Sequence, residues 1–186
     1  MDMDTCRLEA VAIGTLIAVE FVPQEGDSFL AYTKEVQITP VLSKGSYREL
    51  REDTVVAAVK QTPDILLGYD LTLTDTCFNP RAFAAADGGE AALDGHAFSS
   101  YFAPAVFTAA SRPGFGLRLY AAQKNEEGED AGYLQLSFAG CTGCPASFSL
   151  SLGGFFLTSY TIRSRPDDTT QSMKIVRLSS LPFEEV

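Results

Sequence analysis

The chain has 186 residues, of which 46% are hydrophobic and 20% charged, and it carries a formal net charge of −10. This length and composition predict one globular domain with a substantial core. The acidic balance argues against a general nucleic-acid-binding protein, because such proteins present a basic surface to the phosphates.

The beginning of the chain predicts neither a signal peptide nor a membrane span. Met1–Asp4 is acidic, whereas a signal peptide begins with positive charge. The apolar run Ala10–Val22 is interrupted by Glu20 and is too short to cross a membrane. We therefore expect a cytosolic protein with no membrane partner, in which the cysteines stay reduced.

The first third of the chain predicts strands followed by one long connection. Residues 8–22 form an apolar run that we interpret as a buried strand, hinged at Gly14. Glu35–Val41 alternates between apolar and polar residues and is a second strand. The segment 43–63 is less regular and heavily charged in its first half, so it predicts a long exposed loop or hairpin.

The stretch from Gly68 to Asp75 shows a clear strand pattern. Its residues alternate strictly between two chemical types, an apolar set of Tyr69, Leu71 and Leu73 and a polar set of Asp70, Thr72 and Thr74. This period of two is typical of a strand with one buried and one wet face. We expect the polar row to face away from the core.

A short helix follows this strand. Asn79 is a favourable N-cap, and Pro80 fits the first helical turn because no N–H is needed there. Gly88 can end the helix in the left-handed conformation. Phe83 and the alanines around it predict about two turns with a small apolar face that packs on a sheet.

The second half of the chain predicts more strands at short spacing. The segments with strand character are 97–103, 115–120, 134–138, 147–152, 155–164 and 174–179, with turns at 125–130 and 140–145. Residues 90–107 otherwise show no clear pattern. From the whole pattern we predict a single, mainly β domain over residues 1–186. We expect an antiparallel β-sandwich or barrel with one short flanking α-helix.

The residues that could carry chemistry do not form a recognisable active site. Cys141 and Cys144 have C-x-x-C spacing, but a zinc site needs four ligands and the chain has a single histidine, His96. We interpret the pair as part of a structural turn, and Cys6 and Cys77 as small core residues.

Two pairs of acidic residues could serve as the paired carboxylates of a glycosidase. They are Asp70 with Asp75 and Glu126 with Glu129, and both patterns are also common among surface acids. The chain has no Gly-x-Ser-x-Gly motif and no phosphate-binding loop. We therefore expect no catalytic residue, no cofactor and no bound metal.

Several segments together resemble the major tail tube proteins of bacteriophages and prophages. The likeness lies in Lys44–Leu50, in Gly68–Asp75 followed by Asn79-Pro80 and an alanine-rich helix ending Asp87-Gly88-Gly89, and in Phe155–Pro166, Met173–Val176 and Leu181-Pro182. Together these segments span most of the chain.

This resemblance implies a structural protein that is not an enzyme. Its fold would be two antiparallel sheets in a barrel-like sandwich with one flanking helix. Copies would form hexameric rings that stack into a hollow tail tube, with other tail proteins as partners and DNA passing through the lumen without sequence-specific binding. The protein would lie in the host bacterial cytoplasm before assembly and in the virion tail afterwards.

The resemblance also suggests roles for two sets of residues. The candidate inter-ring loop is Tyr47, Arg48, Glu49, Leu50, Arg51, Glu52 and Asp53, and the candidate lumen face is Asp70, Thr72 and Thr74. An acidic lumen would repel DNA phosphates and let the genome slide. We expect Asp70→Lys to leave assembly intact, because no buried partner is lost.

Two other functions stay open. One is a β-sandwich binding module for a carbohydrate or protein ligand that uses exposed tyrosines and phenylalanines. The other is a hydrolase with a scattered acid pair. Concentration-dependent assembly into rings or tubes would favour the tail tube over both.

Overall fold

The computed structural model describes residues 12–75, 77–95, 97–107, 112–125, 127–154 and 156–183. In these ranges the chain is mainly β, as expected, with a single helix. The elements are β1 (Ala12–Pro23), β2 (Phe29–Ala31), β3 (Glu35–Ser43), β4 (Tyr47–Glu52), β5 (Val55–Gln61), β6 (Ile65–Asp75), α1 (Pro80–Asp87), β7 (Glu90–Asp94), β8 (Ala97–Phe102), β9 (Phe115–Lys124), β10 (Asp130–Gly143), β11 (Ser147–Ser149), β12 (Leu157–Ser164) and β13 (Lys174–Leu178).

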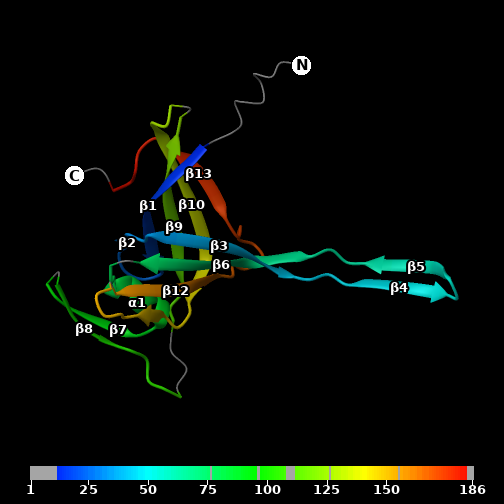
Figure 1. Ribbon diagram of the computed structural model, residues 1–186, viewed down its shortest axis with the longest axis horizontal. Coiled ribbons are helices and arrows are strands. Elements are labelled where there is room, and N and C mark those ends of the chain that lie inside the picture. Colours follow the sequence, from blue (N-terminus) through cyan, green and yellow to red (C-terminus); the bar gives the residue numbers. More distant parts are fainter. Residues whose placement is uncertain are drawn as a thin grey trace.

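Nine strands form one antiparallel sheet that bends over on itself. Its order is β2-β1-β9-β10-β12-β6-β3, with β11 attached to β12 and β13 attached to β10. The bend lies in β10, where the register shifts between Phe138 and Cys141 and Gly140 has a φ of 58°. One layer is β2-β1-β9-β10-β13 and the other is β3-β6-β12-β11, and their strands cross at a large angle (Figure 1).

The two layers enclose a single hydrophobic core. β6 contributes Leu71 and Leu73, both fully buried, which confirms the alternation predicted from the sequence. Phe21 stacks on Phe29 with ring centroids 5.1 Å apart, and Phe115 lies 5.4 Å from it on the other side. The end strands β2 and β3 are not paired with each other, so the described sheet is an open sandwich and not a closed barrel.

Helix α1 closes one side of the sandwich, with the caps that the sequence predicts. The Asn79 Oδ1 accepts hydrogen bonds from the backbone N–H groups of Arg81 and Ala82. Gly88 ends the helix in the left-handed conformation with a φ of 83°. Ala86 packs so closely on β10 that a Cβ at Gly143 would lie 2.1 Å from its carbonyl oxygen. In the described part of the chain, no helix is long and apolar enough to cross a membrane.

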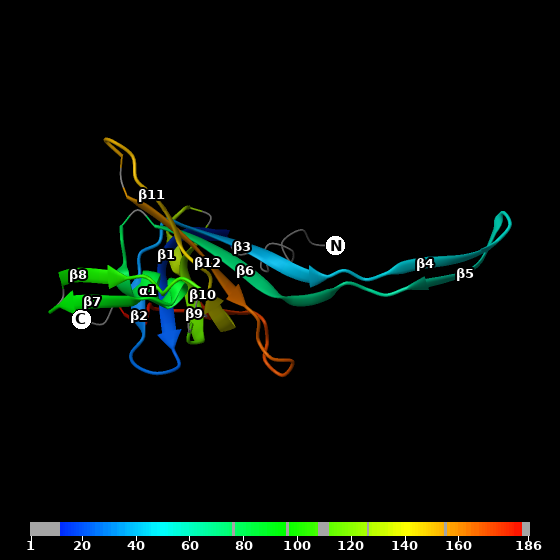
Figure 2. The same cartoon turned by 90° about the horizontal axis from the view of Figure 1, so that it is seen from below.

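Two hairpins project from the sandwich in opposite directions along its longest axis (Figures 1 and 2). The segment expected to be a loop or hairpin is a hairpin of β4 and β5, and every residue of both strands is exposed. At the other end lies the hairpin of β7 and β8. The β8 strand was predicted, whereas β7 was not.

Three sequence-based expectations are wrong. The turn expected at 140–145 is largely strand, because β10 continues through its bulge to Gly143. The strand expected at 147–152 covers only Ser147–Ser149. Cys77 is exposed and is not a core residue. Cys6, His96, Glu126 and Phe155 lie outside the described residues.

Candidate functional site

The polar row predicted on β6 is the centre of a wider polar face. Residues directly opposite each other on neighbouring antiparallel strands share a face of the sheet. The register places Thr39, Gln37 and Glu35 of β3 on one side of Asp70, Thr72 and Thr74, and Arg163, Thr161 and Ser159 of β12 on the other. We call these nine residues the polar face. It lies on the side of the layer opposite to the core residues Leu71 and Leu73.

The charges on and beside the polar face balance. Glu35 and Asp70 are its two acids, Arg163 is its one cation, and Arg165 follows β12 and pairs with Asp70. Two negative and two positive groups sum to zero. The nine residues of the polar face therefore do not form the acidic surface that the resemblance implies for the lumen. Most of their side chains end in hydroxyl or amide groups.

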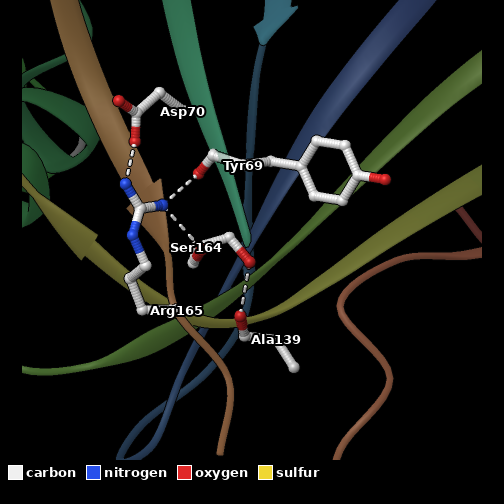
Figure 3. A network of polar contacts seen from close by, with 5 residues as sticks. All are labelled: Tyr69, Asp70, Ala139, Ser164 and Arg165. Atoms are coloured by element: carbon white, nitrogen blue, oxygen red, sulfur yellow. Dashed lines mark hydrogen bonds and ion pairs between the residues drawn. The ribbon is translucent and has the colours of Figure 1, made fainter. Parts of the chain in front are cut away.

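Asp70 has a specific partner, which the sequence did not predict. Figure 3 shows the Arg165 guanidinium between three acceptors. Its Nη2 donates to the Asp70 Oδ1 over 2.6 Å, and its Nη1 donates to the carbonyl oxygens of Tyr69 and Ser164, each over 2.9 Å. The Ser164 hydroxyl in turn donates to the carbonyl of Ala139 over 2.7 Å. The network ties β6 and β12 to the bend in β10, so Asp70→Lys removes an ion pair and places two cations side by side.

Asp70 and Asp75 do not form a carboxylate pair, because they lie on opposite faces of β6. Asp75 is 1% exposed, and its Oδ2 accepts a hydrogen bond of 2.6 Å from the Tyr160 hydroxyl. Burial raises the pKa of Asp75, against the lowering effect of Tyr160 and the neighbouring Thr33. The Asp75 Oδ1 and Thr33 Oγ1 have no partner with hydrogen-bond geometry.

A second buried acid, Glu20, lies on the outer face of the other layer. Its Oε2 accepts hydrogen bonds from the Tyr120 hydroxyl over 2.7 Å and from Arg118 over 3.1 Å. Burial opposes ionisation of Glu20, but hydrogen bonds from Tyr120, Ser28 and Arg118 outweigh it and lower its pKa. Burial and the Glu20 carboxylate raise the pKa of Tyr120 to about 12. Both buried acids thus act as hydrogen-bond acceptors within the fold.

The cysteine motif does not form a reactive pair. Cys141 is fully buried in β10, and burial raises the pKa of its thiol to about 12, far from the thiolate form that redox chemistry uses. Among the described residues, no group of three or more His, Cys, Asp or Glu side chains is arranged to hold a metal ion.

The candidate inter-ring loop, residues 47–53, forms β4 and the first residue of the turn that joins it to β5. Within it, Glu49 accepts hydrogen bonds from the Tyr47 hydroxyl over 2.6 Å and from Arg51 over 2.7 Å. These two bonds lower the pKa of Glu49. Asp53 stands in the turn with a φ of 53°. Arg48, Leu50 and Glu52 are also exposed, so none of the seven residues contacts the core.

Comparisons with known proteins give a fold likeness. No family model and no curated protein matches the sequence. A chain from the sheath–tube complex of the extracellular contractile injection system PVC, in the extended state, matches with a TM-score of 0.53 and 9% identity, over 96% of this chain and 99% of that one. A chain from the baseplate of the anti-feeding prophage (AFP) matches with a TM-score of 0.49 and 12% identity, over 90% and 95%.

A chain from the structure of the tube-terminating cap of the same prophage matches with a TM-score of 0.48 and 9% identity, over 95% of this chain and 99% of that one. The PVC match spans nearly the full length of both chains. The protein therefore shares the fold of a chain in the sheath–tube complex of a contractile injection system.

Proposed function

We propose that the protein is a structural subunit of a phage or phage-like tail, and that copies of it associate side by side into rings that stack into a hollow tube. The rings are hexameric, and DNA passes through the lumen without sequence-specific binding. The observation that carries this proposal is a polar sheet face bounded by β3 and β11, two strands that each have one partner among the described residues. The shared fold with a chain of a sheath–tube complex supports it.

The layer β3-β6-β12-β11 ends in strands that each have one partner in the described chain, β6 for β3 and β12 for β11. Exposed backbone N–H and C=O groups at such edges are templates for pairing with another chain. Pairing the β11 edge of one copy with the β3 edge of the next is a head-to-tail contact, and such contacts form rings when the rotation between copies closes. The same pairing extends the polar face from copy to copy.

A continuous ring of this layer has the polar face on one side and the core on the other. The balanced charges on that face give a DNA strand neither strong attraction nor strong repulsion. The hydroxyl and amide groups of the polar face bind water, so the inner surface of the channel stays hydrated. We assign Asp70, Thr72 and Thr74 to the lumen on this basis, with the tail as the location of the assembled protein and other tail proteins as its partners.

We assign no catalytic role to the protein. Of the two acid pairs named above, Asp70 and Asp75 lie on opposite faces of β6, and Asp75 is hydrogen-bonded to Tyr160 inside the fold. In the other pair, Glu126 lies outside the described residues. The binding-module alternative has one observation in its favour, because Phe98 and Phe148 are 48% and 61% exposed. Binding of a carbohydrate to a protein that stays monomeric would support that alternative.

Negative-stain electron microscopy of the concentrated protein, with sedimentation velocity over a dilution series, tests the proposal. We expect monomers at low concentration and hollow rings or tubes above a threshold. A protein that remains monomeric at every concentration contradicts the proposed function.

A further inference from the structure

Phe148 of β11 is an exposed aromatic side chain whose direction is fixed by the register of the sheet. It stands directly opposite Thr158 of β12, and Thr158 in turn stands opposite Asp75 of β6. Thr158 and Asp75 are 2% and 1% exposed and lie on the core side of the layer. Because directly opposite residues share a face, Phe148 points to the same side. It lies on the end strand of the layer, where its side chain is 61% exposed.

An apolar pocket lies at the other end of the same layer, beside β3. It has a volume of about 350 Å³ and lies between β3 and the strands of the second layer. Val36 and Ile38 line it from β3, and their positions opposite the buried Leu73 and Leu71 place them on the core side. Most of its lining is aliphatic, from Leu16, Val36, Ile38, Leu119, Ala121 and Leu136.

This pocket is a gap in the cover of the core. Leu16, Val36, Ile38 and Leu136 pack against the core but are only partly buried. The gap exists because β2 and β3, the end strands of the nine-stranded sheet, are not paired with each other. A further strand beside β3 would carry an apolar side chain into it.

The strand pairing in the proposed function brings Phe148 and the pocket together. Neighbouring strands of the layer are antiparallel, and β3 and β12 lie on opposite sides of β6 (Figure 1), so β11 runs antiparallel to β3. Rotation about an axis along these strands therefore joins β11 of one copy to β3 of the next as an ordinary antiparallel pair. The core side of one copy then continues into the core side of the next.

We infer that Phe148 of one copy occupies the pocket beside β3 of the next copy around the ring. With Phe148 opposite Val36 or Ile38, its ring enters the pocket from the free edge of β3. Ser147 and Ser149, on the other face of β11, then extend the polar face of that copy. This inference rests on the proposed function and adds to it a buried aromatic anchor for the side-by-side contact. Each copy supplies one ring and one pocket.

A double-mutant cycle tests this contact, with the concentration at which assembly begins as the measured quantity. The ring variant is Phe148→Ala. The pocket variant is Val36→Phe, which fills the pocket from within the chain, and a third variant carries both changes. Phe102→Ala is the matched control, because Phe102 is 66% exposed on β8 and is not on the β11 edge. Sedimentation velocity over a dilution series measures the threshold for each protein.

We expect each single change to raise the threshold at least about tenfold, the scale of losing one buried phenylalanine side chain. The double variant should assemble better than Val36→Phe alone, because its filled pocket no longer meets a second ring. The control should assemble as the wild type does. A Phe148→Ala variant with the wild-type threshold, or two single effects that simply multiply in the double variant, overturns the contact. Wild-type rings seen alongside that result leave the proposed function standing, whereas a wild type that never assembles contradicts both.

Cross-linking decides the question if circular dichroism shows that Val36→Phe does not fold. Phe148→Cys is mixed with Val36→Cys or with Ile38→Cys, each with the other cysteines outside the core changed to serine, and the assembled mixture is oxidised. A directly opposite pair across two strands lies within reach of a disulfide, so one mixture should give a covalent dimer. If neither mixture gives more dimer than Phe102→Cys mixed with the same partners, Phe148 does not enter the pocket.

Discussion

Two buried carboxyl groups of this protein, Asp75 and Glu20, have pKa values shifted in opposite directions, although burial raises both. Each accepts a hydrogen bond from a tyrosine, Tyr160 and Tyr120 respectively. Asp75 has no cation beside it among its described contacts, so burial dominates and its pKa is raised. Glu20 gains Arg118 and Ser28 as well, and its pKa is lowered. The number and charge of the hydrogen-bond donors therefore decide whether the pKa of a buried carboxyl group is raised or lowered.

We predict that Asp75→Asn raises the stability of the protein at neutral pH. Because the folded-state pKa of Asp75 is raised, its favourable contribution is complete below the unfolded-state pKa of about 3.9 and is lost as the pH rises through the folded-state pKa. An asparagine stays neutral, keeps an acceptor for Tyr160 and offers an N–H to the unpaired Thr33 Oγ1. We expect the gain at about pH 8, where Asp75 would have to ionise inside the fold, and no gain at about pH 4.

Urea denaturation at about pH 4 and pH 8 measures this difference, and Glu20→Gln is the matched control. The lowered pKa of Glu20 contributes stability above its unfolded-state value of about 4.3, which is lost as the pH falls through the folded-state pKa. Glu20→Gln should therefore be less stable than the wild type at pH 8, with a gap that narrows in acid. An Asp75→Asn variant that is destabilised more at pH 8 than at pH 4 would contradict this prediction, because the protein would then need Asp75 as an anion.

At the scale of elements, the β4–β5 hairpin is separable from the fold. Its base is closed by a hydrogen bond of 2.9 Å from the Thr62 N–H to the Ser46 carbonyl. Removing only Tyr47–Asp53 would leave β5 without its partner, so the clean change replaces residues 47–61 with a short glycine turn. Since every residue removed is exposed, we expect the free energy of unfolding to change by less than about 0.5 kcal/mol.

The same deletion should abolish stacking along the tube axis. Sedimentation velocity at the concentration at which the wild type assembles measures this effect, and thermal unfolding confirms that the sandwich remains. Tubes that form at the wild-type concentration without residues 47–61 would show that the hairpin is not an inter-ring contact.

The elements that could be predicted are those with local signals. Asn79, Pro80 and Gly88 define α1 within a few residues of sequence, and the alternation around Leu71 defines β6. β4 carries no such signal, because both its faces are exposed and its backbone is satisfied by pairing with β5. The alternation at 147–152 resembles a buried strand, yet Phe148 is 61% exposed. Alternation alone therefore does not show that the apolar face of a strand is buried.

The candidate site was predictable only in part, for a similar reason. The polar row of Asp70, Thr72 and Thr74 follows from alternation alone. The partner of Asp70 could not be found in this way, because Arg165 lies 95 residues away and reaches it through the pairing of β12 with β6. The bend in β10 could not be predicted either. The residues around Gly140 and Cys141 have the sequence pattern of a turn, and only their pairing with β9 and β12 shows that the strand continues through them.

At the scale of the whole molecule, the central claim is that the polar face lines the channel of an assembled tube. The two layers then have different surroundings: β3-β6-β12-β11 faces the channel, and the outer face of β2-β1-β9-β10-β13 faces the exterior. Thr72 stands in the middle of the first layer, between Gln37 and Thr161. Lys174 is exposed on β13 of the second layer, opposite Ser137 of β10.

Cysteine labelling of assembled protein measures this arrangement directly. In a background with Cys6, Cys77 and Cys144 changed to serine, which leaves only the buried Cys141, Thr72→Cys and Lys174→Cys are each treated with a small maleimide and with a polymer-linked maleimide wider than the channel. The account predicts that in tubes Thr72→Cys reacts with the small reagent only, whereas Lys174→Cys reacts with both, and that dissociated protein reacts with both at either site. If Thr72→Cys in intact tubes reacts with the polymer-linked maleimide as fast as Lys174→Cys does, the polar face does not line the channel.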